Sequence, residues 1–395
     1  MSPSLLIKNA VVVTPTARRA RGWLLCEGRT IRLLGSGNAP EFDHTRVIDA
    51  GGLMLLPGFI DVHVHGALGH DTMDANPDGL RAMARFFAQH GVTAFLATTW
   101  SGTGEHIMKA LRTVAALQGP QPDGATLLGA HLEGPYLNPS RCGAQNPAVI
   151  RSAAPEEALQ FLDLNVIRLL SLAPEYPENH WLITECVRRG VVVSAAHTAA
   201  TYDQMLAAIR LGVSHATHTY NAMTGLNHRE PGTLGAVMTA PDVFCELIAD
   251  NIHVHPVAMV ILLAVKGIER LVLITDAVSA AGLPDGEYQV DARPVQIRDG
   301  AVRLPDGTLA GSALTMDRAL YNLSLATGQP IAALWPTTSL NAARSIRIAD
   351  RKGSLEVGKD ADLVLVDEQA HVHLTIAEGQ IVYQRDADHE SGTSR

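Results

Sequence analysis

Residues 126–135 read Thr126-Leu-Leu-Gly-Ala-His-Leu-Glu-Gly-Pro135 and predict the end of a buried β-strand. Alternation along a strand points His131 and Glu133 to the same side. Gly134 and Pro135 stop the strand directly after the carboxylate. A lone Glu at a strand end is more often simply exposed, so its meaning depends on the rest of the chain. In a barrel of parallel strands this carboxyl-terminal edge carries the chemistry.

Apolar strand-length segments alternate with helical segments through the middle of the chain. The helical segments include 78–90 and 105–117, where apolar residues recur at helical spacing; 316–326 and 338–348 are further expected helices. Alternation of this kind predicts an α/β fold, a (β/α)8 TIM-like barrel over residues 57–348. The eight expected strands are 53–64, 93–100, 126–133, 166–173, 191–197, 213–220, 243–252 and 270–277.

Both ends of the chain contain short β-type runs separated by Gly, Pro and polar turns. We expect residues 1–56 and 349–385 to form one small discontinuous β-sandwich domain closed by both chain ends. Residues 386–395 are polar without an apolar anchor, which predicts a flexible tail.

Composition limits the kind of partner. The formal net charge of −9 over 395 residues argues against nucleic acid and anionic membranes as partners. The apolar run 257–265 is about half the length of a membrane span, and the first residues lack the pattern of a signal peptide. Four cysteines without C-x-x-C spacing argue against a disulfide framework. We therefore expect a soluble cytoplasmic α/β enzyme or binding protein, and the net charge does not exclude a small phosphorylated substrate.

Histidine or acidic residues stand at the ends of six expected strands. They are His63, His65, Glu133, His197, His218, Asp250, His253 and Asp276. A single histidine at a strand end is usually structural, and we interpret His215 in that way. Several on one barrel rim favour a metal site, and nitrogen and oxygen ligands without thiolates suit Zn²⁺ or Fe²⁺. The similar pair His371-Val-His373 lies in the expected terminal β domain, away from the rim.

This arrangement resembles the amidohydrolase superfamily, and longer motifs resemble its N-acetylglucosamine-6-phosphate deacetylases. The motifs fall within residues 57–312. They are His131-Leu-Glu-Gly-Pro-Tyr-Leu-Asn-Pro, Gly143-Ala-Gln-Asn-Pro, Ser171-Leu-Ala-Pro-Glu, Ala196-His-Thr-Ala-Ala-Thr, Thr217-His-Thr-Tyr-Asn-Ala-Met, Arg229-Glu-Pro-Gly, Ala249-Asp-Asn-Ile-His, Leu273-Ile-Thr-Asp-Ala and Leu309-Ala-Gly-Ser.

The resemblance implies a divalent ion, Zn²⁺ or Fe²⁺, bound by Glu133, His197 and His218. His63 and His65 would hold a second ion that Glu133 bridges, so each subunit would contain one or two ions. Asp276, at the end of the last expected barrel strand, matches the family's catalytic acid and base: it would take a proton from water and return it to the sugar nitrogen.

The resemblance also implies contacts to a phosphorylated amino sugar. Arg229 would bind its phosphate in the active site of the neighbouring subunit of a homodimer. The other implied substrate contacts are Ala144, Asn221, Ala222, His253, Leu309, Ala310 and Gly311, the last two in a segment that closes over the substrate.

The expected reaction is deacetylation of N-acetyl-D-glucosamine 6-phosphate to D-glucosamine 6-phosphate and acetate, in amino-sugar catabolism or cell-wall sugar recycling. Three alternatives stay open at this point: a deacetylase of the galactosamine epimer, another amidohydrolase acting on a cyclic amide, and a non-enzymatic scaffold. A scaffold would be expected to have lost ligands, which this chain retains.

Overall fold

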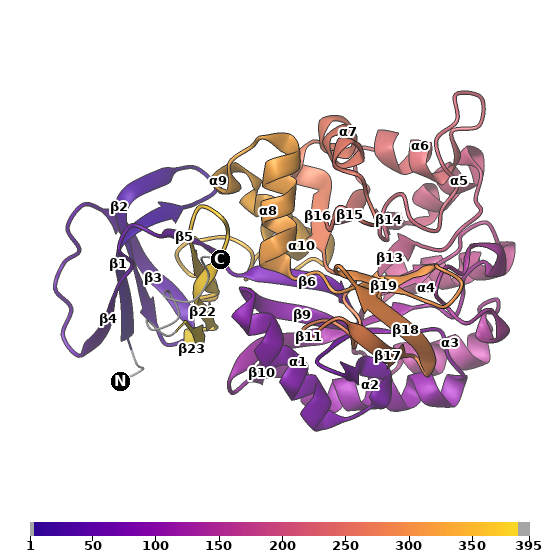
Figure 1. Ribbon diagram of the computed structural model, residues 1–395, viewed down its shortest axis with the longest axis horizontal. Coiled ribbons are helices and arrows are strands. Elements are labelled where there is room, and N and C mark those ends of the chain that lie inside the picture. Colours follow the sequence, from indigo (N-terminus) through magenta and orange to yellow (C-terminus); the bar gives the residue numbers. More distant parts are fainter. Residues whose placement is uncertain (1–3, 386–395) are drawn as a thin grey trace.

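The computed structural model describes residues 4–385, in which a barrel of parallel strands stands beside a sheet built from both chain ends (Figure 1). The segment 386–395, expected to be a flexible tail, lies outside the described residues.

Eight parallel strands form the barrel, in the order β16-β15-β14-β13-β12-β11-β9-β6. They follow one another in the sequence, as helix-connected parallel strands do. A short strand, β10 (Gly119–Gln121), pairs antiparallel with β11. The barrel strands are β6 (Phe59–Val64), β9 (Val92–Thr99), β11 (Gly124–Glu133), β12 (Ile167–Leu172), β13 (Val192–Ala195), β14 (Val213–Ala216), β15 (Phe244–Ile248) and β16 (Leu271–Ile274).

Hydrogen bonds join β6 to the end of β16, the two strands at the ends of this order. The backbone N–H of Asp276 donates to the carbonyl of His63 at 2.9 Å. The hydroxyl of Thr275 donates to the buried Asp61 carboxylate at 2.6 Å. These contacts bring the first and last strands together, and the predicted (β/α)8 architecture is confirmed.

Helices cover the outside of the barrel. The first, α1 (Pro77–Gln89), starts at the side-chain cap Asn76 with Pro77 in its first turn, and it buries Leu80, Met83 and Phe87 against the strands. The others are α2 (Gly104–Leu117), α3 (Pro155–Leu162), α4 (His180–Arg188), α5 (Tyr202–Leu211), α6 (Gly232–Thr239), α7 (Pro256–Lys266), α8 (Met316–Thr327), α9 (Ile331–Leu334) and α10 (Leu340–Ser345). The expected helix 338–348 is therefore shorter in the structure.

The expected first barrel strand, 53–64, is two strands in different sheets. β5 (Met54–Pro57) pairs with the C-terminal strand β21 (Leu363–Val366), whereas β6 belongs to the barrel. Gly58 separates them, and a Cβ at this position would lie 2.2 Å from Cγ2 of Thr93. The chain thus passes from one sheet to the other at a residue where no side chain fits. Because residues on both sides of Gly58 are apolar, the sequence pattern does not show that the strand is divided there.

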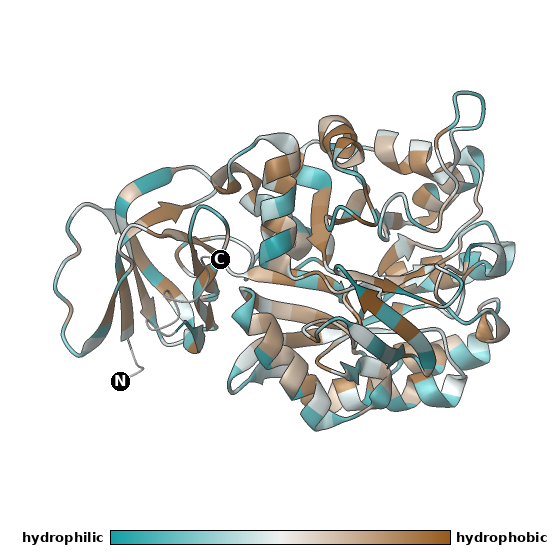
Figure 2. Ribbon diagram, viewed as in Figure 1, coloured by the Kyte–Doolittle hydropathy of each residue, from teal (hydrophilic) through white to brown (hydrophobic). Residues whose placement is uncertain are grey.

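One mixed sheet of eight strands joins the two chain ends. Its order is β23-β22-β21-β5-β1-β2-β3, with β4 paired to β1. Residues from both ends, such as Ile7, Leu24, Leu363 and Ile376, share one buried core. Apolar residues also dominate the strands of both sheets (Figure 2). The remaining strands here are β1 (Ser4–Val13), β2 (Arg18–Glu27), β3 (Thr30–Ser36), β4 (Thr45–Asp49), β22 (Val372–Ala377) and β23 (Gln380–Gln384).

A small antiparallel sheet lies between β16 and α8 in the sequence and was not expected as strands. It consists of β17 (Gly286–Val290), β18 (Arg293–Arg298), β19 (Ala301–Arg303) and β20 (Leu309–Ser312). A β-bridge between Ala277 and Ser312 ties it to the end of barrel strand β16. It therefore stands at the carboxyl-terminal edge of the barrel, as does the hairpin of β7 (Gly66–Ala67) and β8 (His70–Asp71) that follows β6.

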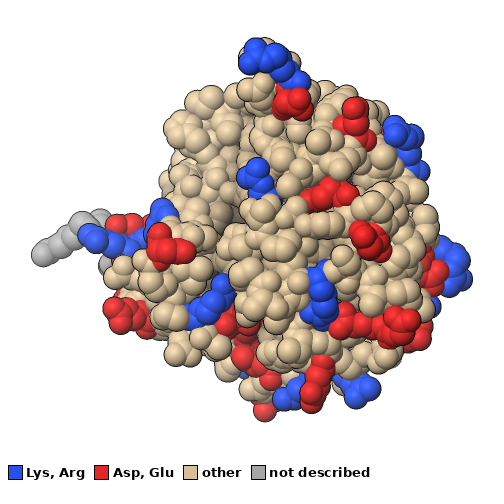
Figure 3. Space-filling view, turned by 90° about the vertical axis from the view of Figure 1, so that its right-hand side faces the viewer, with Lys and Arg blue, Asp and Glu red and all other residues tan. Residues whose placement is uncertain are grey.

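The surface has mixed charge on the face shown in Figure 3, where acidic and basic side chains are interspersed. Along residues 4–385, every helix is too short or too polar to pass through a bilayer.

Candidate active site

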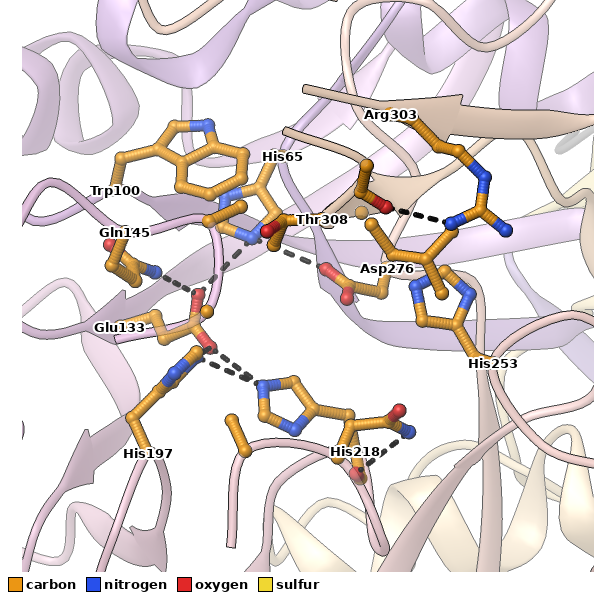
Figure 4. A pocket seen from close by; sticks show the side chains of 17 residues that line it. His65, Trp100, Glu133, Gln145, His197, His218, His253, Asp276, Arg303 and Thr308 are labelled. Atoms are coloured by element: carbon orange, nitrogen blue, oxygen red, sulfur yellow. Dashed lines mark hydrogen bonds and ion pairs between the residues drawn. The ribbon is translucent and has the colours of Figure 1, made fainter. Parts of the chain in front are cut away.

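A cavity of about 350 Å³ opens at the carboxyl-terminal edge of the barrel (Figure 4). Most of the expected site residues meet there, although they come from distant parts of the sequence. Its lining consists of His65, Trp100, Glu133, Gly143, Ala144, Gln145, His197, His218, Asn221, Ala222, His253, Asp276, Arg303, Gly307, Thr308, Leu309 and Gly311.

The carboxylate of Glu133 lies between two pairs of histidines. Its Oε1 is 3.2 Å from Nε2 of His197 and 3.3 Å from Nε2 of His218. Its Oε2 is 3.2 Å from Nε2 of His65 and 3.7 Å from Nε2 of His63. One buried carboxylate at the end of β11 thus connects two separate groups of nitrogen atoms.

Hydrogen bonds on the far side of two rings define which nitrogen faces this carboxylate. Nδ1 of His197 donates to the carbonyl of Arg141 at 2.8 Å, and Nδ1 of His63 donates to Oε2 of Glu246 at 2.9 Å. In the neutral ring the other nitrogen then carries a lone pair. Lone pairs of both rings therefore point toward the oxygens of Glu133, an arrangement that a cation between them would stabilise.

The donor atoms fit a divalent cation in number and type. Glu133 with His197 and His218 forms one group, and Glu133 with His63 and His65 forms a second; in each group the ligand atoms lie within 4.8 Å of one another. The Nε2 atoms of His197 and His218 are 3.1 Å apart, and those of His63 and His65 are 3.4 Å apart. Imidazole nitrogens with carboxylate oxygens suit Zn²⁺ or Fe²⁺.

Asp276 lies on the histidine side of this cavity. Its Oδ1 is 3.3 Å from Nε2 of His63 and 3.4 Å from Nε2 of His65. Burial raises the pKa of Asp276, but the charge of His63 and a hydrogen bond from His65 outweigh burial and lower it to about 2. Positive charge beside Asp276, from protonated histidines or from a cation that they hold, favours its ionised form, which can accept a proton.

Three site residues share one backbone feature. His197, His218 and Asp276 each stand two residues after the last residue of a barrel strand, and each has a positive φ, of 43°, 28° and 49°. Left-handed backbone is uncommon for residues other than glycine and asparagine, and it gathers at functional sites. The same left-handed residue, two positions after each of three parallel strands, directs three side chains into one cavity.

The opposite end of the cavity is lined by groups suited to a sugar phosphate. Nδ1 of His253 donates to Oδ2 of Asp250 at 2.6 Å, which holds the ring at the wall. Ala222 and the loop after β11 that carries Ala144 lie beside His197, since a Cβ at Gly143 would be 3.3 Å from Cε1 of His197 and 4.0 Å from Cβ of Ala222. Asn221, Leu309 and Gly311 also line the cavity.

Three expected residues do not line the cavity. His63 is fully buried behind His65, and Ala310 is fully buried within β20. Arg229 lies on the exposed loop between β14 and α6, where its nearest hydrogen-bonding partner is Nε2 of the adjacent His228 at 2.8 Å. Arg229 therefore does not contribute to the cavity of its own chain.

Residues that the sequence did not single out complete the wall. Nε2 of Gln145 donates to Oε2 of Glu133 at 2.8 Å, while its Oε1 accepts from the N–H of Ser101. The ring of Trp100 stacks on His65 with centroids 4.1 Å apart. Gln145 lies inside a quoted motif and was a visible candidate, whereas Trp100 and the β19–β20 turn had no signal in the sequence.

A model of the amidohydrolase family matches residues 54–382, and the chain belongs to this family. It is 39% identical over 395 residues to the N-acetylglucosamine-6-phosphate deacetylase of Bacillus subtilis, covering 98% of this chain and 100% of that protein. It is 40% identical over 330 residues to the N-acetylgalactosamine-6-phosphate deacetylase of Escherichia coli, covering 83% and 87% of the two chains.

A solved structure extends the similarity to three dimensions. It is that of a variant N-acetyl-D-glucosamine-6-phosphate deacetylase from Mycobacterium smegmatis in complex with N-acetyl-D-glucosamine-6-phosphate. The TM-score is 0.89 at 31% identity, with 97% of this chain and 100% of that chain covered. The resemblance seen in the motifs is confirmed.

Proposed function

We propose that the protein is a metal-dependent hydrolase that converts N-acetyl-D-glucosamine 6-phosphate and water to D-glucosamine 6-phosphate and acetate. The observation that carries this proposal is the placement of Glu133 between two histidine pairs, with Asp276 beside them in one cavity. Full-length relatives that carry this name support the choice of substrate. Its expected setting is the cytoplasm, in amino-sugar catabolism or cell-wall sugar recycling.

We assign the principal divalent ion to Glu133, His197 and His218, and a second to Glu133, His63 and His65. The proposed ion is Zn²⁺ or Fe²⁺, one or two per subunit. Such an ion lowers the pKa of a coordinated water and polarises the acetyl oxygen. The protein itself contributes the fixed directions of the rings, set by the acceptors on their Nδ1 atoms.

The proposed work of Asp276 is proton transfer. Its carboxylate accepts a proton from the water as the water oxygen attacks the acetyl carbon. It then donates that proton to the sugar nitrogen as the carbon–nitrogen bond breaks, which releases a neutral amine instead of an anion. The position of Asp276, with Oδ1 beside Nε2 of His63 and of His65, supports the first role.

Substrate contacts are proposed for residues around the cavity other than the metal ligands and Asp276. They are Ala144, Asn221, Ala222, His253, Leu309, Ala310 and Gly311, of which all but Ala310 line the cavity. The second candidate function is deacetylation of the galactosamine epimer, which the 40% identical Escherichia coli relative favours. The two substrates differ in the direction of one hydroxyl.

We further propose a homodimer in which Arg229 reaches the neighbouring active site. The exposed position of Arg229 supports this, as do exposed apolar side chains: Leu226 on the same loop is 60% exposed, and Val257 and Ile261 on α7 are 59% and 49% exposed. Analytical ultracentrifugation of the wild type and of Ile261→Asp tests the proposal. A monomeric wild-type protein at micromolar concentration would contradict it.

Acetate release by protein of measured metal content tests the substrate. N-acetylglucosamine 6-phosphate, its galactosamine epimer and unphosphorylated N-acetylglucosamine are compared by kcat/KM. We expect the first to be the best substrate. A higher value for the epimer would establish the second candidate, and metal-loaded protein that releases no acetate from any of the three would overturn both.

A further inference from the structure

Arg303 lies at the end of β19 and lines the same cavity as the proposed metal ligands. Among the lining residues it is the only lysine or arginine. In Figure 4 the side chains of Arg303 and His253 lie on the same side of the cavity, and Asp276 lies between them and Glu133. The positive charge therefore stands on the side of the cavity away from Glu133 and the histidines around it.

The guanidinium of Arg303 is held in place but not neutralised. Its Nη1 donates to the carbonyl of Gly307 at 2.8 Å, across the turn that joins β19 to β20. Within residues 4–385 no carboxylate oxygen lies within 4.0 Å of it, in contrast to Arg188 and Arg351, which form ion pairs. Its remaining N–H groups are free to bind an anion.

The turn itself is rigid enough to hold this side chain. The N–H of Leu304 donates to the carbonyl of Thr308, and the N–H of Gly307 donates back to the carbonyl of Leu304. Gly307 has a φ of 89°, which a residue with a side chain rarely adopts. This geometry fixes Arg303 over the cavity, next to Thr308, whose hydroxyl is a further donor.

We propose that Arg303 binds the phosphate of the substrate from within its own subunit, opposite the arginine contributed by the neighbour. This inference rests on the proposed function. The acetamido group on C2 and the phosphate on C6 leave the sugar ring on opposite sides. A substrate whose acetyl group lies beside Glu133 and Asp276 therefore directs its phosphate away from Glu133, toward the side of the cavity where Arg303 and His253 lie. A planar guanidinium can hold two phosphate oxygens at once, which fixes the sugar's direction relative to Asp276.

Steady-state kinetics of Arg303→Met on the full-length, metal-quantified protein test this proposal. The substrates are N-acetylglucosamine 6-phosphate and unphosphorylated N-acetylglucosamine, and the measured quantity is the ratio of their kcat/KM values. We expect this ratio to fall roughly tenfold to a hundredfold, mainly through KM, because a charged hydrogen bond is lost. Arg303→Lys keeps the positive charge but not the two parallel N–H donors of the guanidinium. Its ratio is expected to lie between those of the wild type and Arg303→Met.

Arg298→Met is the matched control, since Arg298 is an exposed arginine on the neighbouring strand β18 that does not line the cavity. Arg229→Met reports the contribution of the neighbour's arginine separately. If the ratio for Arg303→Met equals that of the control, the proposed role of Arg303 is wrong, while the proposed function stands. A wild-type protein that hydrolyses both sugars equally would overturn the phosphorylated substrate itself, and Arg303's role with it.

Discussion

Oε2 of Glu246 lies 2.9 Å from Nδ1 of His63, with both side chains fully buried beneath the cavity. The same oxygen accepts the backbone N–H of His218 at 2.9 Å. One carboxylate on β15 therefore orients a proposed ligand of the second ion and supports the turn that carries a ligand of the first. Carboxylates behind metal-binding histidines commonly set the ring's direction and tautomer.

Replacing Glu246 should weaken the binding of the second ion more than the binding of the first. We expect Glu246→Leu to lower its affinity about tenfold to a hundredfold, as for other residues that orient metal ligands. Glu246→Gln keeps an acceptor oxygen, so its loss of affinity for the second ion should be smaller. Competition with a chelator of known affinity measures both constants. Equal losses in the two variants would argue that the hydrogen bond to His63 is unimportant.

Separate substitutions should distinguish the two proposed ions. We expect His218→Ala to lose the principal ion and nearly all activity. His65→Ala should retain the principal ion, since His65 lies beside Oε2 of Glu133, whereas His197 and His218 lie beside Oε1. Metal analysis after dialysis against a chelator and re-addition of one metal gives ions per chain. A single ion per chain in the wild type, unchanged in His65→Ala, would show that the second group does not hold metal.

A buried ion network outside the active site predicts a large effect on stability. Lys352 is 1% exposed and its Nζ lies 3.0 Å from Asp360, 2.7 Å from Asp362 and 3.1 Å from Glu378. Lys352→Met leaves these carboxylates without their shared cation, so we expect about 3–5 kcal/mol lower free energy of unfolding. Urea denaturation measures this, with the exposed Lys109→Met as a control that should change little.

The same network gives a dependence on pH. Burial raises the pKa of Asp360, but its hydrogen bond to Arg351 and the charge of Lys352 outweigh burial and lower it. A carboxyl group with a lowered folded-state pKa contributes stability above its unfolded value near 4, and this contribution is lost as the pH falls through the folded-state pKa. The difference between wild type and Lys352→Met should therefore be larger at pH 7 than at about pH 3, below the unfolded value. A constant difference would contradict the assignment.

Much of the barrel follows from the sequence. Each strand is an apolar run of strand length, and the parallel arrangement places the residues that end them on one rim. This explains why Glu133, His197, His218 and Asp276, spread over the middle of the chain, meet in one cavity. His371 and His373 have the spacing of His63 and His65 but lie on or beside β22 in the other sheet.

Features that depend on contacts between distant segments were not predictable in the same way. The change of sheet at Gly58 depends on the position of Thr93. Glu246 lies inside an apolar strand and gains its role only from the neighbouring ends of β6 and β14. Arg303 lies in a stretch with weak strand signals, and only the folded turn places it at the cavity.

The central claim is that Asp276 transfers the proton at a metal centre organised by Glu133. Acetate release from N-acetylglucosamine 6-phosphate by wild type and Asp276→Asn, at equal measured metal content, tests it most directly. We predict a fall in kcat of roughly a thousandfold, within the usual range for general acid–base groups, with metal content unchanged. Wild-type activity retained in Asp276→Asn would contradict this mechanism, as would metal-loaded wild-type protein that leaves the substrate intact.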